Sequence, residues 1–193
     1  MFIPIIRQRL LLSACKTQSR NIFGYFRVAF NALDTDRLKT VGPDRLCAEW
    51  ILKNGGFIKF ENQKWITDYN ALPAVNFRYQ IEEVDTHNKT TIMAMGFDHF
   101  KDCSAIRKIS LKSCRYLENE AIEKLGYLKD SLSELEINGC YNVIDEGLLS
   151  LKQLKNLKKL NIENLPYVKD MKAVQQELQT ALAGCEIQII SKK

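Results

Sequence analysis

The residues best suited to chemistry in this chain of 193 residues are six cysteines and two histidines. The cysteines form no C-x-x-C pair and show none of the spacings that zinc sites use, so a zinc centre is not expected. Phosphate-binding motifs of the G-x-x-x-x-G-K-[ST] and G-x-G-x-x-G types are also missing from the sequence. Cys114 and Cys140 need an explanation, because they lie 26 residues apart and each closes a similar apolar pattern.

Those two cysteines belong to a repeat with a period of 25 or 26 residues. Three copies are clear: I-x-x-I-x-L-x-x-C at 106–114, L-x-x-L-x-I-x-x-C at 132–140, and a copy at 157–165 that ends on leucine. A weaker copy begins at Ile81. This spacing predicts an α/β fold, a short leucine-rich-repeat solenoid of about four strand-helix units of the cysteine-containing type. We expect Cys114 and Cys140 to be buried small hydrophobic residues, since no histidine lies beside them in the register.

The second half of each copy predicts a helix that returns to the start of the next strand. Apolar residues recur there at helical spacing, and small residues precede them where neighbouring helices have to pass closely. Three residues of N-cap type stand thirteen residues after the starts of the last three copies: Asn119, Asp145 and Asp170. We therefore expect each of them to cap the helix that follows. Alternation of apolar and polar residues at 185–189 predicts a closing strand.

The repeat also places residues on the outward face of the predicted strands. One column across that face alternates in charge and consists of Glu83, Lys108, Glu134 and Lys159. Neighbouring strands lie about 4.8 Å apart, so these charges can pair across strands. Two interpretations stay open: the face binds a protein partner, or its charges only keep the strands soluble and in register. His99 falls on the helical side of its copy, where we expect it to be exposed.

The first residues of the chain differ in composition from the repeats. The formal net charge is +5, and residues 1–33 hold five basic residues and no acidic one. This composition, without a long apolar run, predicts a mitochondrial presequence over residues 1–21 rather than a secretory signal. No stretch has the roughly 20 apolar residues of a membrane-spanning helix. The remaining chain is neutral, which disfavours a nucleic-acid partner.

Residues 22–80 predict a mostly helical N-terminal cap domain, and residues 81–193 predict the leucine-rich-repeat domain. One helix is expected to begin at Pro43 and to stop at two glycines, and a hairpin is expected at 57–67. Two tryptophans are expected in the core, Trp50 and Trp65. A solenoid needs a cover over its first unit, and this segment is placed to provide one.

Four segments carry a resemblance to a known family: VGPDR at 41–45, AEWILKNGG at 48–56, KWITDYNALP at 64–73 and IMAMGFDHF at 92–100. Together with the cysteine repeats, they resemble the family of subunit s, or coupling factor B, of the mitochondrial F-type ATP synthase. The resemblance covers the chain from about residue 22 to its C-terminus. It implies a non-enzymatic, peripheral protein on the matrix side of the inner membrane. It also implies association with the ATP synthase membrane sector, support of coupled proton conduction and prevention of a proton leak.

The same resemblance implies a Mg²⁺ site where the N-terminal segment meets the repeats. The glycine ligand of the family corresponds to Gly55, and its threonine ligand corresponds to His87 or Thr86, because this chain has one extra residue there. A main-chain carbonyl ligand would tolerate that difference, whereas His87 would be a poor replacement for a hydroxyl. Family members carry C-x-C where this chain has KSC at 112–114, so a role for a vicinal dithiol does not transfer.

Two other functions remain open on the sequence. Related repeat proteins act as assembly factors for another inner-membrane complex, such as the distal arm of complex I. Cysteine-type repeats also occur in ubiquitin-ligase substrate adaptors, but residues 22–60 lack an F-box pattern and the presequence indicates another compartment. An enzyme with a small-molecule substrate has the least support, because neither His87 nor His99 has a nucleophile beside it in the register.

Overall fold

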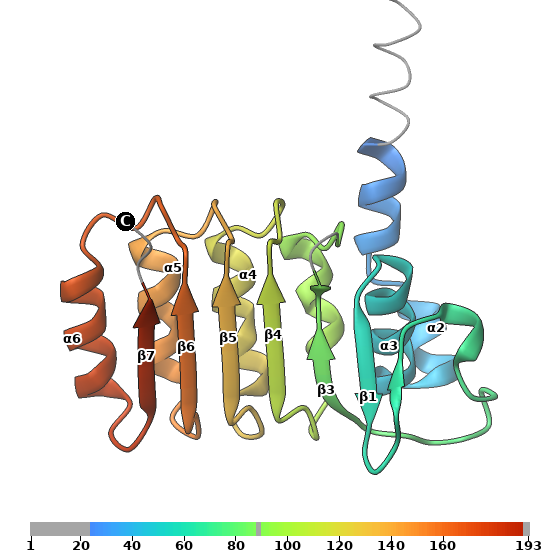
Figure 1. Cartoon of the computed structure of the whole chain (residues 1–193). Helices are drawn as coiled ribbons and strands as arrows, with labels where there is room; N and C mark the ends of the chain where they lie inside the picture. Colours follow the sequence, from blue (N-terminus) through green and yellow to red (C-terminus); the bar gives the residue numbers. More distant parts are fainter. Residues whose placement is uncertain (1–23, 88–89, 191–193) are drawn as a thin grey trace, which may run out of the picture.

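The structure, a computed structural model, describes residues 24–87 and 90–190, so the expected presequence lies outside the described residues. One seven-stranded sheet runs through the molecule, and its helices lie behind one face and leave the other open (Figure 1). In spatial order its strands are β2 (Trp65–Ile66), β1 (Phe57–Phe60), β3 (Ile81–Asp85), β4 (Lys108–Lys112), β5 (Glu134–Asn138), β6 (Lys159–Glu163) and β7 (Glu186–Ile190). The fold is therefore mixed α/β. Among the described helices, none is long and apolar enough to cross a membrane.

Several helices precede β1, and a helix follows each of the strands β3 to β6. A helix at 24–31 comes first. It is followed in chain order by α2 (Thr35–Val41), α3 (Pro43–Lys53) and the 3₁₀ helices η1 (Tyr69–Ala71) and η3 (Ala94–Phe100), then α4 (Asn119–Lys124), η4 (Leu125–Leu128), α5 (Asp145–Leu149), η5 (Ser150–Gln153) and α6 (Met171–Ala181). Strands β3 to β7 are all parallel, whereas β1 pairs with both β2 and β3 in the antiparallel direction. The N-terminal segment thus continues the same sheet.

Local sequence signals explain the helices of the N-terminal segment. The Asp34 carboxylate accepts hydrogen bonds from two main-chain N–H groups in the first turn of α2. Gly42, with a φ of 84°, makes the sharp bend before α3, and Pro43 occupies the first position of that helix. The chain leaves α3 through Gly55, with a φ of 81°. The expected helix from Pro43 and the expected hairpin are therefore confirmed.

Glu49 carries a buried carboxylate in this N-terminal segment. Its side chain is 2% exposed and contacts Arg37 at 2.7 Å and Arg45 at 2.9 Å. Burial disfavours the charged form of Glu49, but hydrogen bonds from the two guanidinium groups outweigh burial and lower its pKa. The pair with Arg37 joins α2 to α3, whereas the pair with Arg45 lies within α3.

Asn31 joins the first helix to the rest of the molecule. Its side chain is completely buried, and its Oδ1 accepts hydrogen bonds from Nε1 of Trp50 at 3.1 Å and from the main-chain N–H of Met93 at 2.9 Å. Its Nδ2 donates to Oδ1 of Asn54 at 3.1 Å and to the carbonyl of Thr91 at 3.0 Å. One side chain thus connects the helix at 24–31, α3 and the first strand-helix unit.

The repeat pattern explains the parallel part of the sheet. The apolar positions of the strands point to the helical side, where Ile109, Leu135 and Leu160 are at most 2% exposed. Cys114 and Cys140 are fully buried, as the sequence predicts. Each parallel strand from β3 to β6 is followed by a residue with positive φ, at intervals of 25 or 26 residues: His87 (46°), Ser113 (51°), Gly139 (66°) and Asn164 (56°). This common turn confirms the register that the cysteines indicate.

The capping prediction is wrong for two of its three residues. Asp170 does cap α6, because its Oδ1 accepts the N–H of Ala173 at 2.9 Å. Asn119 is instead the first residue of α4, and its Oδ1 accepts the N–H of Ile144 in the next unit at 3.0 Å. Asp145 accepts the N–H groups of Lys169 and Asp170, both at 2.9 Å. These side chains therefore stabilise the contact between successive units rather than the helices on which they lie.

Two predictions of exposure are also wrong. His99 is 5% exposed, because its ring stacks on Trp50 at a centroid distance of 4.9 Å and its Nδ1 donates to the carbonyl of Gly96 at 2.8 Å. Burial lowers the pKa of His99. Trp65 is 44% exposed, because β2 is a two-residue strand at the edge of the sheet. Trp50, at 2% exposure, is a core residue as expected.

Candidate functional site

The open face of the sheet carries an ordered column of charges that is longer than the sequence predicts. The strand register places six residues side by side with alternating charge: Lys59, Glu83, Lys108, Glu134, Lys159 and Glu186. Within this column, Nζ of Lys108 lies 3.4 Å from Glu134, and Nζ of Lys59 lies 2.5 Å from Glu83. The four residues expected from the repeat are therefore neighbours in space. The repeat does not predict Lys59 and Glu186, because β1 and β7 lie outside its full pattern.

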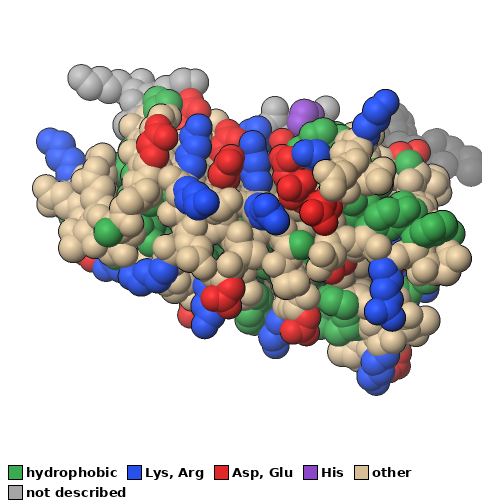
Figure 2. All heavy atoms as spheres, turned by 90° about the horizontal axis from the view of Figure 1, so that it is seen from below, with side chains coloured by type: hydrophobic (Ala, Val, Ile, Leu, Met, Phe, Trp, Pro, Cys, Tyr) green, Lys and Arg blue, Asp and Glu red, His purple; other side chains and the backbone are tan. Residues whose placement is uncertain are grey.

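A second group of charges on the same face centres on Lys112. Its ammonium lies between Asp85 at 3.5 Å and Glu136 at 3.3 Å, and Glu136 also accepts a hydrogen bond from Ser110 at 2.7 Å. Burial disfavours the charged lysine, but the two carboxylates outweigh burial and raise the pKa of Lys112. Figure 2, which views the molecule from below, shows basic and acidic side chains interleaved rather than gathered by sign on that side. Such a surface has little long-range attraction for a polyanion and suits a partner with complementary pattern.

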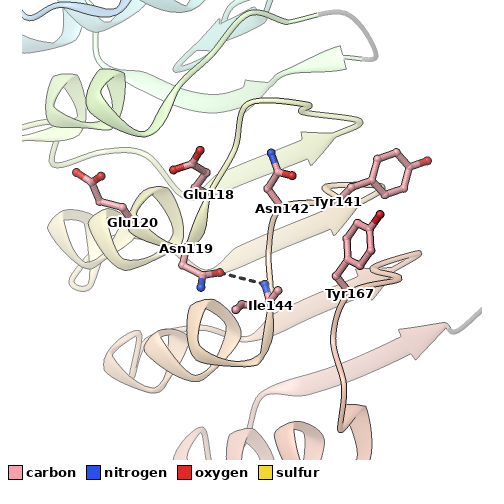
Figure 3. A pocket seen from close by; sticks show the side chains of 7 residues that line it. All are labelled: Glu118, Asn119, Glu120, Tyr141, Asn142, Ile144 and Tyr167. Carbon is pink, nitrogen blue, oxygen red and sulfur yellow. Dashed lines mark hydrogen bonds between the residues drawn. The ribbon is translucent and has the colours of Figure 1, made fainter.

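A shallow hollow of about 490 Å³ lies where the loops after the strands meet the starts of α4 and α5 (Figure 3). Glu118 and Glu120 line one side, and the exposed rings of Tyr141 and Tyr167 line another. The hydrogen bond from Ile144 to Asn119 crosses its floor. Besides the two glutamates and the two tyrosines, its lining consists of two asparagines and one isoleucine, so the hollow is polar and carries two carboxylates.

The end of α3 and the end of β3 meet at the junction between the N-terminal segment and the first unit. A Cβ at Gly56 would lie 3.3 Å from the carbonyl oxygen of Asp85, and the N–H of Thr91 donates to the carbonyl of Asn54 at 3.1 Å. The ring of His87 stacks on Phe57 at 5.1 Å. The structure thus brings the segment of Gly55 beside that of His87.

Comparison with known proteins gives the family of the chain. The protein named ATP synthase subunit s, mitochondrial, of Mus musculus is 37% identical over 196 aligned positions, which cover 98% of both chains. The chain belongs to the mitochondrial ATP synthase subunit s family. The relatives of the same name from Macaca fascicularis and Homo sapiens are 36% and 35% identical over 176 residues, which cover 89% of this chain and 88% of each relative.

Two further comparisons add no function. No protein-family model matches the chain. Among solved structures, leiomodin-1 actin-binding site 2 aligns with a TM-score of 0.45 and 14% identity, over 56% of this chain and 69% of that chain. A likeness this weak carries no argument.

The residues expected from the family resemblance as Mg²⁺ ligands differ in what their side chains can offer. The Thr86 hydroxyl is buried, accepts the main-chain N–H of Lys112 at 2.8 Å and lies 3.1 Å from Sγ of Cys114. It is therefore engaged by protein partners and does not fit as a metal ligand. Gly55 can offer only main-chain atoms. No group of three or more His, Cys, Asp or Glu within 24–87 and 90–190 could hold a metal ion.

Most cysteines in the described part of this member of the subunit s family lie in the core. The five cysteines in the described residues are free thiols, and four of them are buried. A hydrogen bond with Cys140 lowers the pKa of Cys114, and the same interaction raises the pKa of Cys140. Thr86 and Thr90 place hydroxyl groups 3.1 and 3.5 Å from the Cys114 sulfur. The pair is fully buried and connects neighbouring units.

Proposed function

We propose that the protein is a non-enzymatic accessory subunit of the mitochondrial ATP synthase, peripheral to the inner membrane on its matrix side. In this role it binds the membrane sector, supports coupled proton conduction and limits proton leak. The observation that carries the proposal is the match to ATP synthase subunit s along 98% of both chains. The burial of Cys114 and Cys140 in the core supports a scaffolding role for these two thiols.

The architecture that we propose for this role is a leucine-rich-repeat solenoid over residues 81–193, with residues 22–80 as its N-terminal cap. The repeating positive-φ turn and the parallel register of β3 to β7 support the solenoid. The antiparallel pairing of β1 with β3, and the buried hydrogen bonds of Asn31, support the assignment of the cap. The open face with its charge column is the surface that we assign to the partner.

For the Mg²⁺ site implied by the family resemblance, we propose ligation by main-chain oxygens of Gly55 and His87, completed by water. A bound Mg²⁺ would supply a divalent charge that holds the two segments of the junction together. The adjacency of the two segments supports this route, and the engaged Thr86 hydroxyl argues against ligation by that side chain.

Thermal unfolding tests the main-chain route. MgCl₂ is expected to raise the Tm of the wild-type protein and of Thr86→Val by equal amounts, because valine replaces the hydroxyl with a methyl group and leaves the main-chain oxygens in place. A shift that disappears in Thr86→Val, or no shift in the wild-type protein, refutes main-chain ligation. NaCl at the same ionic strength controls for screening of charge.

Crosslinking mass spectrometry on intact inner membranes tests the partner. We expect lysine-reactive crosslinks from Lys108 or Lys159, on the open face, to subunits of the ATP synthase membrane sector. Crosslinks to complex I alone would refute the assignment. Depletion of the protein should raise the proton leak of inner-membrane vesicles, and addition of the purified protein should reverse it. Loss of complex I at normal leak would instead indicate an assembly factor.

A further inference from the structure

β7 forms an open edge of the sheet (Figure 1). In the described residues it pairs with β6 alone, through bonds such as the N–H of Glu186 to the carbonyl of Lys158 at 2.8 Å. Residues of a strand face its two neighbours alternately, so the main-chain groups of Glu186 and Ile190 face β6. Those of Ile187 and Ile189 consequently face outward, where another strand can pair with them.

The apolar layer of the fold is also incomplete at this edge. Leu160 and Ile162 of β6 are at most 1% exposed, because β7 covers them. Ile187 and Ile189 occupy the equivalent positions in β7 and are only partly buried against the core. A strand that added itself to β7 would cover these two side chains if it carried apolar residues at the paired positions.

The charge column shows what such a strand must carry next to those apolar residues. The column alternates between lysine and glutamate across six strands and ends on Glu186. A basic residue opposite Glu186 would continue the alternation, whereas an acidic residue there would be repelled.

We propose that β7 binds an extended segment of a protein partner as an eighth, parallel strand with the pattern basic, apolar, any residue, apolar. The strand β6 already presents this pattern to β7 as Lys159, Leu160, Asn161 and Ile162. The occupant is therefore a segment of the kind that the sheet uses internally. This inference goes beyond the proposed role in ATP synthase, because it describes the binding segment whichever complex supplies it.

Peptide binding to the full chain tests the proposal. The probe is a synthetic peptide with the sequence of residues 158–164, KKLNIEN, capped at both ends and labelled for fluorescence anisotropy. We expect saturable binding that slows hydrogen exchange at the amides of Ile187 and Ile189, whereas the amide of Glu186 is already bonded to β6. A variant peptide with glutamate in place of the second lysine should bind roughly two- to fivefold more weakly.

Charge exchange provides the matched control. Glu186→Lys should reverse the preference, so that the glutamate peptide binds better than the lysine peptide by a similar factor. The side chain of Glu186 is exposed, so this variant keeps the fold. Peptide binding that is indifferent to Glu186→Lys would overturn the parallel register and with it the proposal.

A backbone variant separates strand addition from simple apolar contact. Ile189→Pro removes an N–H that faces outward and leaves the bonds to β6, whereas Ile189→Ala removes only side-chain atoms. We expect the proline variant to lose binding well beyond the alanine variant. Equal losses in the two variants would overturn strand addition. Protection of Ile187 and Ile189 that rises with protein concentration without peptide would identify a second copy as the occupant and also overturn the proposal.

Discussion

The side chain of Asn31 offers the sharpest test of how the N-terminal segment is attached to the repeats. In Asn31→Ala, Nε1 of Trp50 and the N–H of Met93 both lose their acceptor; the bond from Trp50 is buried, and the bond from Met93 is partly buried. An unpaired buried donor costs about 1–3 kcal/mol. Asn54 keeps a partner, because Thr91 still donates to its Oδ1 at 2.8 Å. We therefore expect a loss of about 3 kcal/mol in the free energy of unfolding.

Urea unfolding followed by tryptophan fluorescence measures this loss, because Trp50 lies at the site of the change. Val28→Ala on the same helix is the matched control, since Val28 is 46% exposed, and its effect should stay within about 0.5 kcal/mol. Limited proteolysis should also cleave near residues 24–31 faster in Asn31→Ala. A loss below about 1 kcal/mol would refute the reasoning, because it would show that both donors find other acceptors.

Three further variants test the other buried and paired groups. Glu49→Gln should cost about 2 kcal/mol in the free energy of unfolding at neutral pH, because two arginines lose their carboxylate. Since the folded-state pKa of Glu49 is lowered, the stability that its carboxylate contributes is complete above the ordinary carboxyl pKa and is lost as the pH falls through the folded-state value. The urea unfolding curves of the two proteins should therefore converge in acid. Cys114→Ser should cost about 1–2 kcal/mol in the free energy of unfolding and leave proton coupling in reconstituted vesicles unchanged. Selective loss of coupling at normal stability would contradict the assignment of Cys114 to the core. Lys112→Met should cost up to about 1 kcal/mol at low salt and less at high salt in the same unfolding assay, whereas an effect independent of salt would exclude a charge origin.

The strand register could be predicted because the repeat reports it several times. Ile109, Leu135 and Leu160 recur at one offset, and a shift by one residue would turn all of them toward solvent. The buried positions of Cys114 and Cys140 follow from the same constraint. Periodicity thus determines the parallel strands, because every unit must match its neighbours.

Features that depend on contacts between units could not be predicted from one unit. Asn119 has a side chain suited to capping, but its Oδ1 accepts an N–H from the next unit instead. A Cβ at Gly147 would lie 2.4 Å from that oxygen, so the small residue of one helix accommodates the polar residue of another. His99 is buried because Trp50, 49 residues earlier, covers it. Such pairings have no period along the chain.

In the candidate site, too, the residues that follow the repeat could be predicted and the others could not. The repeat predicts four members of the charge column, whereas Lys59 joins through an antiparallel strand and Glu186 through a strand without the full pattern. Each exposed pair contributes at most about 1 kcal/mol, so the column adds little to stability. Its stronger effect is to disfavour a like charge beside each of its members. Its three lysines and three glutamates also leave the column with no net charge. A partner of this face must therefore be selected by the order of its own charges at short range, and an acidic residue placed opposite the terminal Glu186 would be rejected.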